Sequence, residues 1–242
     1  MHISDAIELS SRLEGWLSIN EQRLLYSLAR EVRPDQSIVE LGAWQGKSTV
    51  MLAAGAISGG NKSSIFSVDY FSAIPTTDYG YASHLTGSSD YLEAFQRNLS
   101  KAHLAERVTP IRSHTGKAAE TWTGPPIGLL FIDADHRYES VREDFLAWVR
   151  HCAGGSRVAF HDYGVKKHPG VLNFVNQLIA AQVIDDIQRG DSILHARLCV
   201  RDVRSISRRL VFHPVWRSRL RSLLTRGWER LARTVKRRMG IG

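Results

Sequence analysis

The sequence predicts an α/β fold built on a mostly parallel, doubly wound sheet. Three observations predict it. Apolar runs rich in β-branched residues alternate with helical patterns, those runs are almost continuously apolar, and the tripeptide RGD separates the last two of them. Continuous apolar runs are typical of parallel strands that helices cover on both faces. Regular alternation of strand and helix then indicates a Rossmann-like arrangement.

The elements follow one another at the spacing of that fold. Two helices precede the first strand, and a closing antiparallel hairpin is expected where RGD joins VIDDIQ to SILHARLCV. The expected strands are SIVEL, SIFSVD, RVTPI, GLLFID and SRVAFH, at residues 37–41, 64–69, 107–111, 128–133 and 156–161. The expected later helices cover residues 46–57, 90–104, 115–121, 137–152 and 169–181.

Charge divides the chain of 242 residues into two parts. The net charge is +8, but residues 201–242 contain 13 Lys and Arg against 2 Asp and Glu, whereas the residues before them contain 19 against 22. The basic character is therefore a property of the C-terminus and says nothing about a ligand of the main domain. We expect one domain at residues 1–203 and a basic helical tail at 204–242.

The tail has the pattern of a basic amphipathic helix. Its apolar positions recur at helical spacing and arginines fill the opposite face. This pattern suits an anionic membrane surface, and equally a helix that packs on its own domain or on a second copy of the chain. Nucleic acid is disfavoured because aromatic and basic residues segregate. The apolar positions are Trp216, Leu220, Leu223, Leu224, Trp228, Leu231 and Val235.

The sequence carries the features of a cytoplasmic protein. Its two cysteines, Cys152 and Cys199, lack metal-type spacing, which favours a reducing compartment. The N-terminus has no apolar core of a signal peptide, and no run approaches the roughly 18 apolar residues of a spanning helix. A membrane-binding tail would place the protein peripherally on the inner membrane face.

A glycine turn follows the first strand, in VELGAWQGKST at residues 39–49. Gly42 permits a tight turn and a close backbone approach, and Gly46 opens a helix whose free N–H groups suit a carboxylate or a phosphate. The spacing is neither GxGxxG nor a Walker motif, which disfavours a nucleoside triphosphate. A glycine turn without a ligand remains an equal alternative.

The second strand ends at Asp69, in SVDYF. An acidic residue at this place is suited to hold a ribose diol, although a turn or helix-capping aspartate has the same signature. Together with the glycine turn, Asp69 favours a nucleoside-bearing cofactor over the first two strands. The Ser-, Thr-, Tyr- and Gly-rich stretch 71–89 that follows is either a lid or a surface loop.

Titratable side chains end the fourth and fifth strands. Asp133 closes FID, and His161 and Asp162 close FHD. If these strands are neighbours, the two carboxylates converge, and they repel unless a proton or a cation lies between them. Oxygen ligands favour Mg²⁺, and an imidazole shifts the preference towards transition metals. Asp162 could instead cap a turn.

Two further residues with titratable side chains, Asp135 and His136, follow Asp133 closely. We interpret Asp135 as a capping residue of the helix that begins near Arg137. His136 lies over the same rim of the sheet and could act as a general base, or it could simply begin that helix.

At these residues the chain resembles the class I S-adenosylmethionine-dependent methyltransferases. More narrowly, it looks like their metal-dependent O-methyltransferase branch, which includes sugar and macrolide O-methyltransferases and cephalosporin-hydroxylase-like proteins. The matching pieces occur in the expected order and cover most of residues 37–178. They are VELGAWQGKST, SVDYF, FIDADHRYESVREDFLAW, GGSRVAFHDY and HPGVLNFV.

The resemblance implies a seven-stranded sheet with an antiparallel last strand, and it assigns roles to residues. By resemblance, Asp69 holds the ribose of the cofactor and His136 is the general base. The cofactor turn would be lined by Glu40, Gly42 and Gly46, and the metal ligands would be Asp133, His161 and Asp162. The family often has an acidic residue near the adenine; here the loop reads IRSHTG, so Ser113 is expected at that contact.

The resulting prediction is an O-methyltransferase that uses S-adenosylmethionine with Mg²⁺ or another divalent metal. Its acceptor would be a saccharide or another small polyhydroxylated molecule, or a lipid-linked saccharide if the tail binds membrane; a homo-oligomer is compatible with the sequence. Two alternatives are a nicotinamide-dependent oxidoreductase, which shares the turn and the ribose aspartate, and a non-catalytic interaction protein with a methyltransferase fold.

Overall fold

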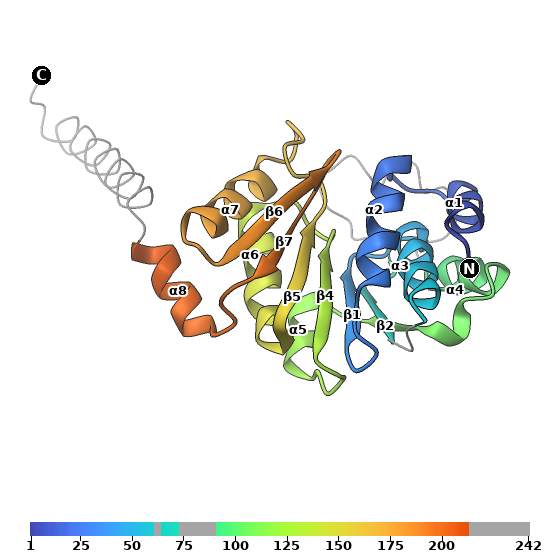
Figure 1. Ribbon diagram of the computed structural model, residues 1–242, viewed down its shortest axis with the longest axis horizontal. Coiled ribbons are helices and arrows are strands. Elements are labelled where there is room, and N and C mark those ends of the chain that lie inside the picture. Colours follow the sequence, from blue (N-terminus) through green and yellow to red (C-terminus); the bar gives the residue numbers. More distant parts are fainter. Residues whose placement is uncertain (61–63, 73–90, 213–242) are drawn as a thin grey trace, which may run out of the picture.

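The computed structural model describes residues 1–60, 64–72 and 91–212 (Figure 1). Most of the expected loop 71–89 and the tail from residue 213 onward, with all of its predicted apolar positions, lie outside the described residues.

The core of the protein is a seven-stranded sheet with the strand order β3-β2-β1-β4-β5-β7-β6. The first five strands pair in parallel, while β7 is antiparallel to both β5 and β6. This confirms the predicted fold class, including the closing hairpin. The strands are β1 Ser37–Leu41, β2 Ile65–Asp69, β3 Val108–Arg112, β4 Ile127–Ile132, β5 Cys152–Phe160, β6 Ile184–Gly190 and β7 Ile193–Leu198.

Helices cover both faces of the sheet (Figure 1). One apolar cluster joins α1 to α4 to one face, and a second joins α5 to α8 to the other. The helices are α1 Ile3–Ser11, α2 Ile19–Arg30, α3 Lys47–Ser58, α4 Leu92–Lys101, α5 Thr115–Glu120, α6 Tyr138–Trp148, α7 Pro169–Ala180 and α8 Val203–Phe212, with short 3₁₀ turns at Ala105–Arg107 and Val149–His151.

Strand alternation decides which face each side chain meets. In β4 and β5, Phe131 and Ala159 lie in the cluster under α1 to α4, whereas Ile132 and Phe160 lie in the cluster under α5 to α8. Because side chains alternate along a strand, a residue two positions after Ala159 returns to the face that α2 covers. This places His161 towards the N-terminal helices.

The junction before β5 differs from the prediction. The helix expected at 137–152 ends at Trp148, and β5 begins at Cys152 instead of residue 156. Gly155 adopts a φ of +76°, which a glycine allows at little cost, and the pairing of β4 with β5 shifts register in this region. Gly154 and Gly155, which precede the strand expected at 156–161, therefore lie inside an irregular strand start.

Helix α8, at the start of the basic tail, packs on the domain. Ile206 is fully buried and Leu210 is 3% exposed, and an Arg209 guanidinium N–H donates to the carbonyl of Gln182 over 3.0 Å. Within the described ranges, no helix is long and apolar enough to cross a bilayer. Both cysteines are free thiols, Cys152 buried and Cys199 exposed.

Candidate active site

Side chains that end β4 and β5 meet at the carboxyl rim of the sheet. Asp133 and His161 follow paired strand ends, and Asp133 Oδ1 lies 2.9 Å from His161 Nδ1. Asp162 Oδ2 lies 3.7 Å from the same nitrogen. One ligand atom from each of the three residues lies within 4.8 Å of the others. The structure therefore brings together the three residues predicted to bind metal, and their role stays a prediction.

The backbone holds these side chains at the rim. The sheet hydrogen bonding continues one residue past each strand, since Asp133 N donates to Leu41 O over 2.8 Å and His161 N donates to Ile132 O over 3.1 Å. Asp162 then adopts a left-handed conformation with φ of +58°, which costs a non-glycine residue about 1–2 kcal/mol. Such strain persists where the surrounding structure enforces it, as it often does in functional sites.

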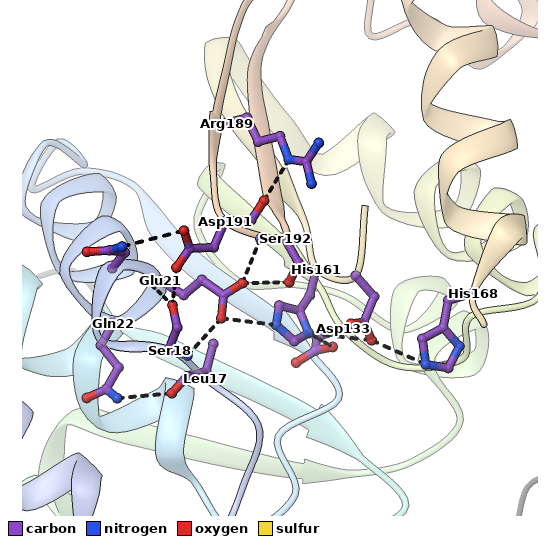
Figure 2. A network of polar contacts seen from close by, with 12 residues as sticks. Leu17, Ser18, Glu21, Gln22, Asp133, His161, His168, Arg189, Asp191 and Ser192 are labelled. Atoms are coloured by element: carbon purple, nitrogen blue, oxygen red, sulfur yellow. Dashed lines mark hydrogen bonds and ion pairs between the residues drawn. The ribbon is translucent and has the colours of Figure 1, made fainter. Parts of the chain in front are cut away.

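His161 lies between carboxylates on both sides of its ring (Figure 2). Its side chain is 5% exposed, with Nδ1 towards Asp133 and Nε2 at 3.7 Å from Glu21 Oε2. Burial lowers the pKa of His161, but the charge and hydrogen bond of Asp133, the contact with Glu21 and the charge of Asp162 outweigh burial and raise that pKa to about 11. Without a metal, His161 is a cation that neutralises this anionic rim.

A second group of ligand atoms shares Asp162. His136 Nε2 is 2.8 Å from Asp162 Oδ2, and His168 Nε2 is 3.7 Å from the same oxygen. The imidazoles of His136 and His168 stack with centroids 4.0 Å apart. His168 has a 2% exposed side chain, and its Nδ1 is buried without a hydrogen-bond partner. His136 therefore lies beside the predicted metal ligands, where a general base is expected.

The donor set fits a divalent cation. A neutral imidazole nitrogen and a carboxylate oxygen are both acceptors, so His161 Nδ1 and Asp133 Oδ1 at 2.9 Å need a proton or a cation between them. Two carboxylates with one imidazole are ligands that Mg²⁺, Mn²⁺ and related ions accept. The residues present would therefore hold such an ion without rearrangement of the strands.

Asp135 belongs to the backbone turn and not to the rim. Its carboxylate accepts from Arg137 N over 3.0 Å, from Ser140 Oγ over 2.9 Å and from the Arg137 guanidinium. Burial raises the pKa of Asp135, but these hydrogen bonds prevail and lower it. The interpretation of Asp135 as a helix cap is therefore wrong: the N-cap of α6 is Arg137, no side chain caps the helix, and Asp135 stabilises the turn that precedes it because α6 begins one residue later than expected.

The glycine turn lies directly against the rim that carries the predicted metal ligands. Gly42 has a φ of +86°, and a Cβ built on it would lie 2.2 Å from the carbonyl oxygen of Asp133. Only a glycine allows so close an approach of the two backbones. Gly46, with φ of +92°, precedes α3. A ligand bound at the N-terminus of α3 would therefore adjoin Asp133.

Glu40 supports this turn from within the core. Its side chain is fully buried, and its carboxylate accepts hydrogen bonds from the hydroxyls of Ser48, Thr49 and Ser67. Burial raises the pKa of Glu40 to about 7, although the three hydroxyls act in the opposite direction. The structure differs here from the predicted cofactor contact, because the carboxylate faces the protein interior behind the turn.

Asp69 holds the turn from the neighbouring strand. Its Oδ2 accepts from the backbone N–H groups of Ala43 and Trp44, over 2.8 and 3.0 Å, and its Oδ1 accepts from Phe71 N over 2.8 Å. The carboxylate thus lies at the turn, and both of its oxygens accept hydrogen bonds from backbone N–H groups. Its role in binding a cofactor stays a prediction.

The loop after β3 lies beside Asp69. Ser113 N donates to Asp69 O over 3.0 Å, and His114 caps α5 by accepting from Gly116 N. The Tyr70 ring is 5.7 Å from the His114 ring and is 40% exposed. Ser113 is therefore near the predicted ribose residue, and its contact with adenine stays a prediction.

Two residues of the site were not predicted from the sequence. His168 precedes Pro169 at the start of α7, and only the HPG stretch in the family resemblance drew attention to this region. Glu21 occupies the third position of a capping box that begins at Ser18, a signal that indicates a helix start and nothing more. Its proximity to His161 depends on how α2 lies on the sheet.

Comparisons with known proteins agree with this arrangement. A family model described as "Methyltransferase domain" matches residues 39–163, more than half of the chain. This match favours a methyltransferase over a nicotinamide-dependent oxidoreductase. It also confirms the resemblance inferred from the sequence.

Solved structures of similar fold include several O-methyltransferases. The O-methyltransferase NovP has 15% identity and a TM-score of 0.63, covering 80% of this chain and 88% of its own. TomG from Streptomyces achromogenes, solved with S-adenosylmethionine, has 18% identity and a TM-score of 0.55, covering 81% and 88%. MycE, solved with Mg and S-adenosylhomocysteine, has 17% identity and a TM-score of 0.53, covering 82% of this chain and 55% of its own. Similarity at this identity establishes the fold.

The family match spans the glycine turn, Asp69 and the whole predicted metal-binding rim up to Tyr163. The chain therefore belongs to the methyltransferase domain family and is an S-adenosylmethionine-dependent methyltransferase.

Proposed function

We propose that this enzyme transfers the methyl group to a hydroxyl oxygen of a saccharide or another small polyhydroxylated acceptor. A divalent cation bound by Asp133, His161 and Asp162 would assist, with His136 as the general base. The observation that carries the proposal is the convergence of these four side chains beside the glycine turn, where the Gly42 backbone packs on the Asp133 carbonyl.

The similar structures support transfer to oxygen. NovP and TomG are described as O-methyltransferases, and MycE, from a mycinamycin biosynthetic pathway, was solved with Mg and S-adenosylhomocysteine. These descriptions apply to those proteins. They make a hydroxyl acceptor and a bound cation the first hypotheses to test here.

The glycine turn and Asp69 would hold the cofactor. The N–H groups at the start of α3 suit its carboxylate, Asp69 would accept hydrogen bonds from its ribose hydroxyls, and Ser113 would lie near its adenine. Gly42 and Gly46 allow the close approach. When bound, S-adenosylmethionine supplies an electrophilic methyl group on a sulfonium.

His136 would remove the proton of the acceptor hydroxyl, and Asp162 would stabilise the protonated His136. A bound cation lowers the pKa of an oxygen that it coordinates. His136 would accept the proton released, and the imidazolium formed would be stabilised by Asp162 Oδ2, which lies 2.8 Å from His136 Nε2. General base catalysis of this kind contributes about 10²–10⁴-fold in rate.

The rim also favours acceptors with neighbouring hydroxyl groups. Three protein ligands leave positions open on a six-coordinate ion, and two adjacent hydroxyls of a sugar or a catechol could fill them. Such chelation would fix the reacting oxygen relative to the methyl group. This is the support for a saccharide or a similar acceptor.

The proposal is tested by methyl transfer assays with mass spectrometry on a set of sugars, nucleotide sugars and catechols. EDTA should abolish transfer, and Mg²⁺ or Mn²⁺ should restore it. His136→Ala should lower kcat by about 10²–10⁴-fold without changing the affinity for S-adenosylmethionine measured by calorimetry. Transfer that persists both in EDTA and in the His136→Ala enzyme would contradict the proposal.

A further inference from the structure

We infer that Glu21, on the N-terminal helix α2, is a positioning residue that orients the His161 imidazole for cation binding. The inference rests on the proposed cation site and adds a residue from a distant part of the sequence. It predicts that the N-terminal helices are needed for metal affinity as well as for folding.

The Glu21 carboxylate is buried and rigidly held (Figure 2). Glu21 is 4% exposed. Its Oε1 accepts from the N–H and the hydroxyl of Ser192, over 2.9 and 2.5 Å, in the β6–β7 turn. Its Oε2 accepts from Ser18 N over 2.9 Å. One carboxylate therefore ties α2 to the closing hairpin, and its position does not depend on His161.

His161 points to this carboxylate because of strand alternation. Its Nε2 lies 3.7 Å from Glu21 Oε2, and within the described residues this buried nitrogen has no hydrogen-bond partner, so the Glu21 carboxylate is its nearest acceptor among the ion pairs of the ring. Its Nδ1 faces Asp133 and Asp162 at the rim. One ring nitrogen therefore faces the proposed cation site, and the other faces α2.

This division is what a metal-binding histidine requires. When one ring nitrogen binds a cation, the other carries a proton, and a carboxylate that accepts a hydrogen bond from this N–H fixes both the tautomer and the ring orientation. The Glu21 carboxylate is already held by hydrogen bonds from Ser192 and Ser18, and its Oε2 is the oxygen that faces His161 Nε2. When a cation replaces the Nδ1 proton, Glu21 would therefore hold the remaining proton on Nε2 and keep Nδ1 directed at the cation.

A purely structural role for Glu21 is the competing explanation. Glu21 N donates to Ser18 Oγ over 3.1 Å, and the Glu21 carboxylate accepts from Ser18 N over 2.9 Å, which completes a capping box. Glutamate and glutamine both serve at this position of a capping box. Glu21→Gln therefore retains the shape of the cap while it removes the charge that faces His161.

The test measures cation affinity directly. Binding of Mn²⁺ to the full-length protein is followed by electron paramagnetic resonance, without cofactor or acceptor. Glu21→Gln should weaken Mn²⁺ binding by about 10–100-fold, the usual effect of losing such a partner. The matched control is Ser18→Ala, which removes the cap hydroxyl and lowers thermal stability but leaves the carboxylate in place. It should bind Mn²⁺ as the unaltered protein does.

A second readout separates failure of this inference from failure of the proposed cation site. If the unaltered protein binds no Mn²⁺, the cation proposal is wrong. The ¹⁵N spectrum of the metal-free protein, assigned with His161→Gln, should then still show a protected Nε2–H of His161 that shifts or disappears in Glu21→Gln. Mn²⁺ affinity and an Nε2–H signal that are both unchanged in Glu21→Gln would overturn the inference.

Discussion

At the scale of single residues, Asp162 is the centre of the site. Its Oδ2 lies within 4 Å of one nitrogen from each of His136, His161 and His168. Burial raises the pKa of Asp162, but the close contact with His136 and the charges of the three imidazoles lower it. This single oxygen therefore links the predicted ligands to the predicted base.

Gly42 offers a test of the contact between the glycine turn and the rim. In Gly42→Ala the new Cβ would meet the Asp133 carbonyl at 2.2 Å. We expect the free energy of unfolding to fall by about 2–4 kcal/mol, from overpacking together with the left-handed backbone, and the affinity for S-adenosylmethionine to fall with it. Thermal unfolding and calorimetry measure the two effects.

The control for this substitution is Gly155→Ala. Gly155 also has a positive φ, of +76°, but a Cβ there would have no atom within 4 Å. Gly155→Ala should lower the free energy of unfolding by about 1 kcal/mol, from the left-handed backbone alone. The affinity for S-adenosylmethionine should not change. Equal losses in the two variants would show that the close approach to Asp133 is unimportant.

Glu40 predicts a dependence of stability on pH. Its pKa is raised to about 7 in the folded protein, so the folded state retains a proton that the unfolded state releases near pH 4.5. Stability from this group is therefore full below pH 4.5 and is lost as the pH rises to about 7, by up to about 3 kcal/mol.

Glu40→Gln removes this titration and should flatten the change in melting temperature between pH 5 and pH 8. The other pH-dependent groups remain in both proteins, so the comparison isolates Glu40. If the melting temperature of Glu40→Gln changes with pH as that of the unaltered protein does, the buried carboxylate does not titrate in this range.

Among these residues, the sequence could identify those that end strands and form turns. Asp133, Asp162 and Gly42 each follow an apolar run, and that position is readable from the pattern. The direction of the Glu40 side chain was not readable, because it depends on the hydroxyls that α3 and β2 bring to the same face of the sheet.

At the scale of elements, α7 and α6 fix the two stacked histidines. A Cβ at Gly170, in the first turn of α7, would lie 2.3 Å from the carbonyl oxygen of His136. The start of α7 therefore packs against the loop before α6, and His168 is carried over the His136 ring. The sequence indicated both helices but gave no sign that their starts touch.

Helix α8 gives a prediction at this scale. Ile206 is fully buried in the core under α5 to α8, so Ile206→Ala should lower the free energy of unfolding by about 2–5 kcal/mol. Arg208, which is exposed on the same helix, provides the control, and Arg208→Ala should change it by less than about 0.5 kcal/mol. Chemical denaturation measures both. If the two variants have the same free energy of unfolding, α8 does not pack on the domain in solution.

At the scale of the whole molecule, the basic tail remains a prediction from sequence. We expect the full chain to sediment with vesicles that contain anionic lipid, because clustered Lys and Arg gain about 1 kcal/mol each near such a surface. A chain that ends at residue 212 keeps α8 and should remain in the supernatant. Neutral vesicles and high salt are the controls. If both chains bind equally, the tail is not the membrane-binding element.

What the sequence determined by itself is local: the order of strands and helices, the turns between them, and the titratable residues at strand ends. Apolar periodicity and glycine positions encode these features, because they depend on near neighbours in the chain. The closing hairpin and the basic tail belong to the same class.

Only the tertiary structure decided which titratable groups, distant in the sequence, lie close enough to interact. Glu21 reaches His161 and His168 stacks on His136 because helices pack on the sheet. No local sequence pattern predicts that packing. Burial then changes the chemistry of these groups, since a carboxylate or an imidazole removed from water depends on the partners that packing supplies.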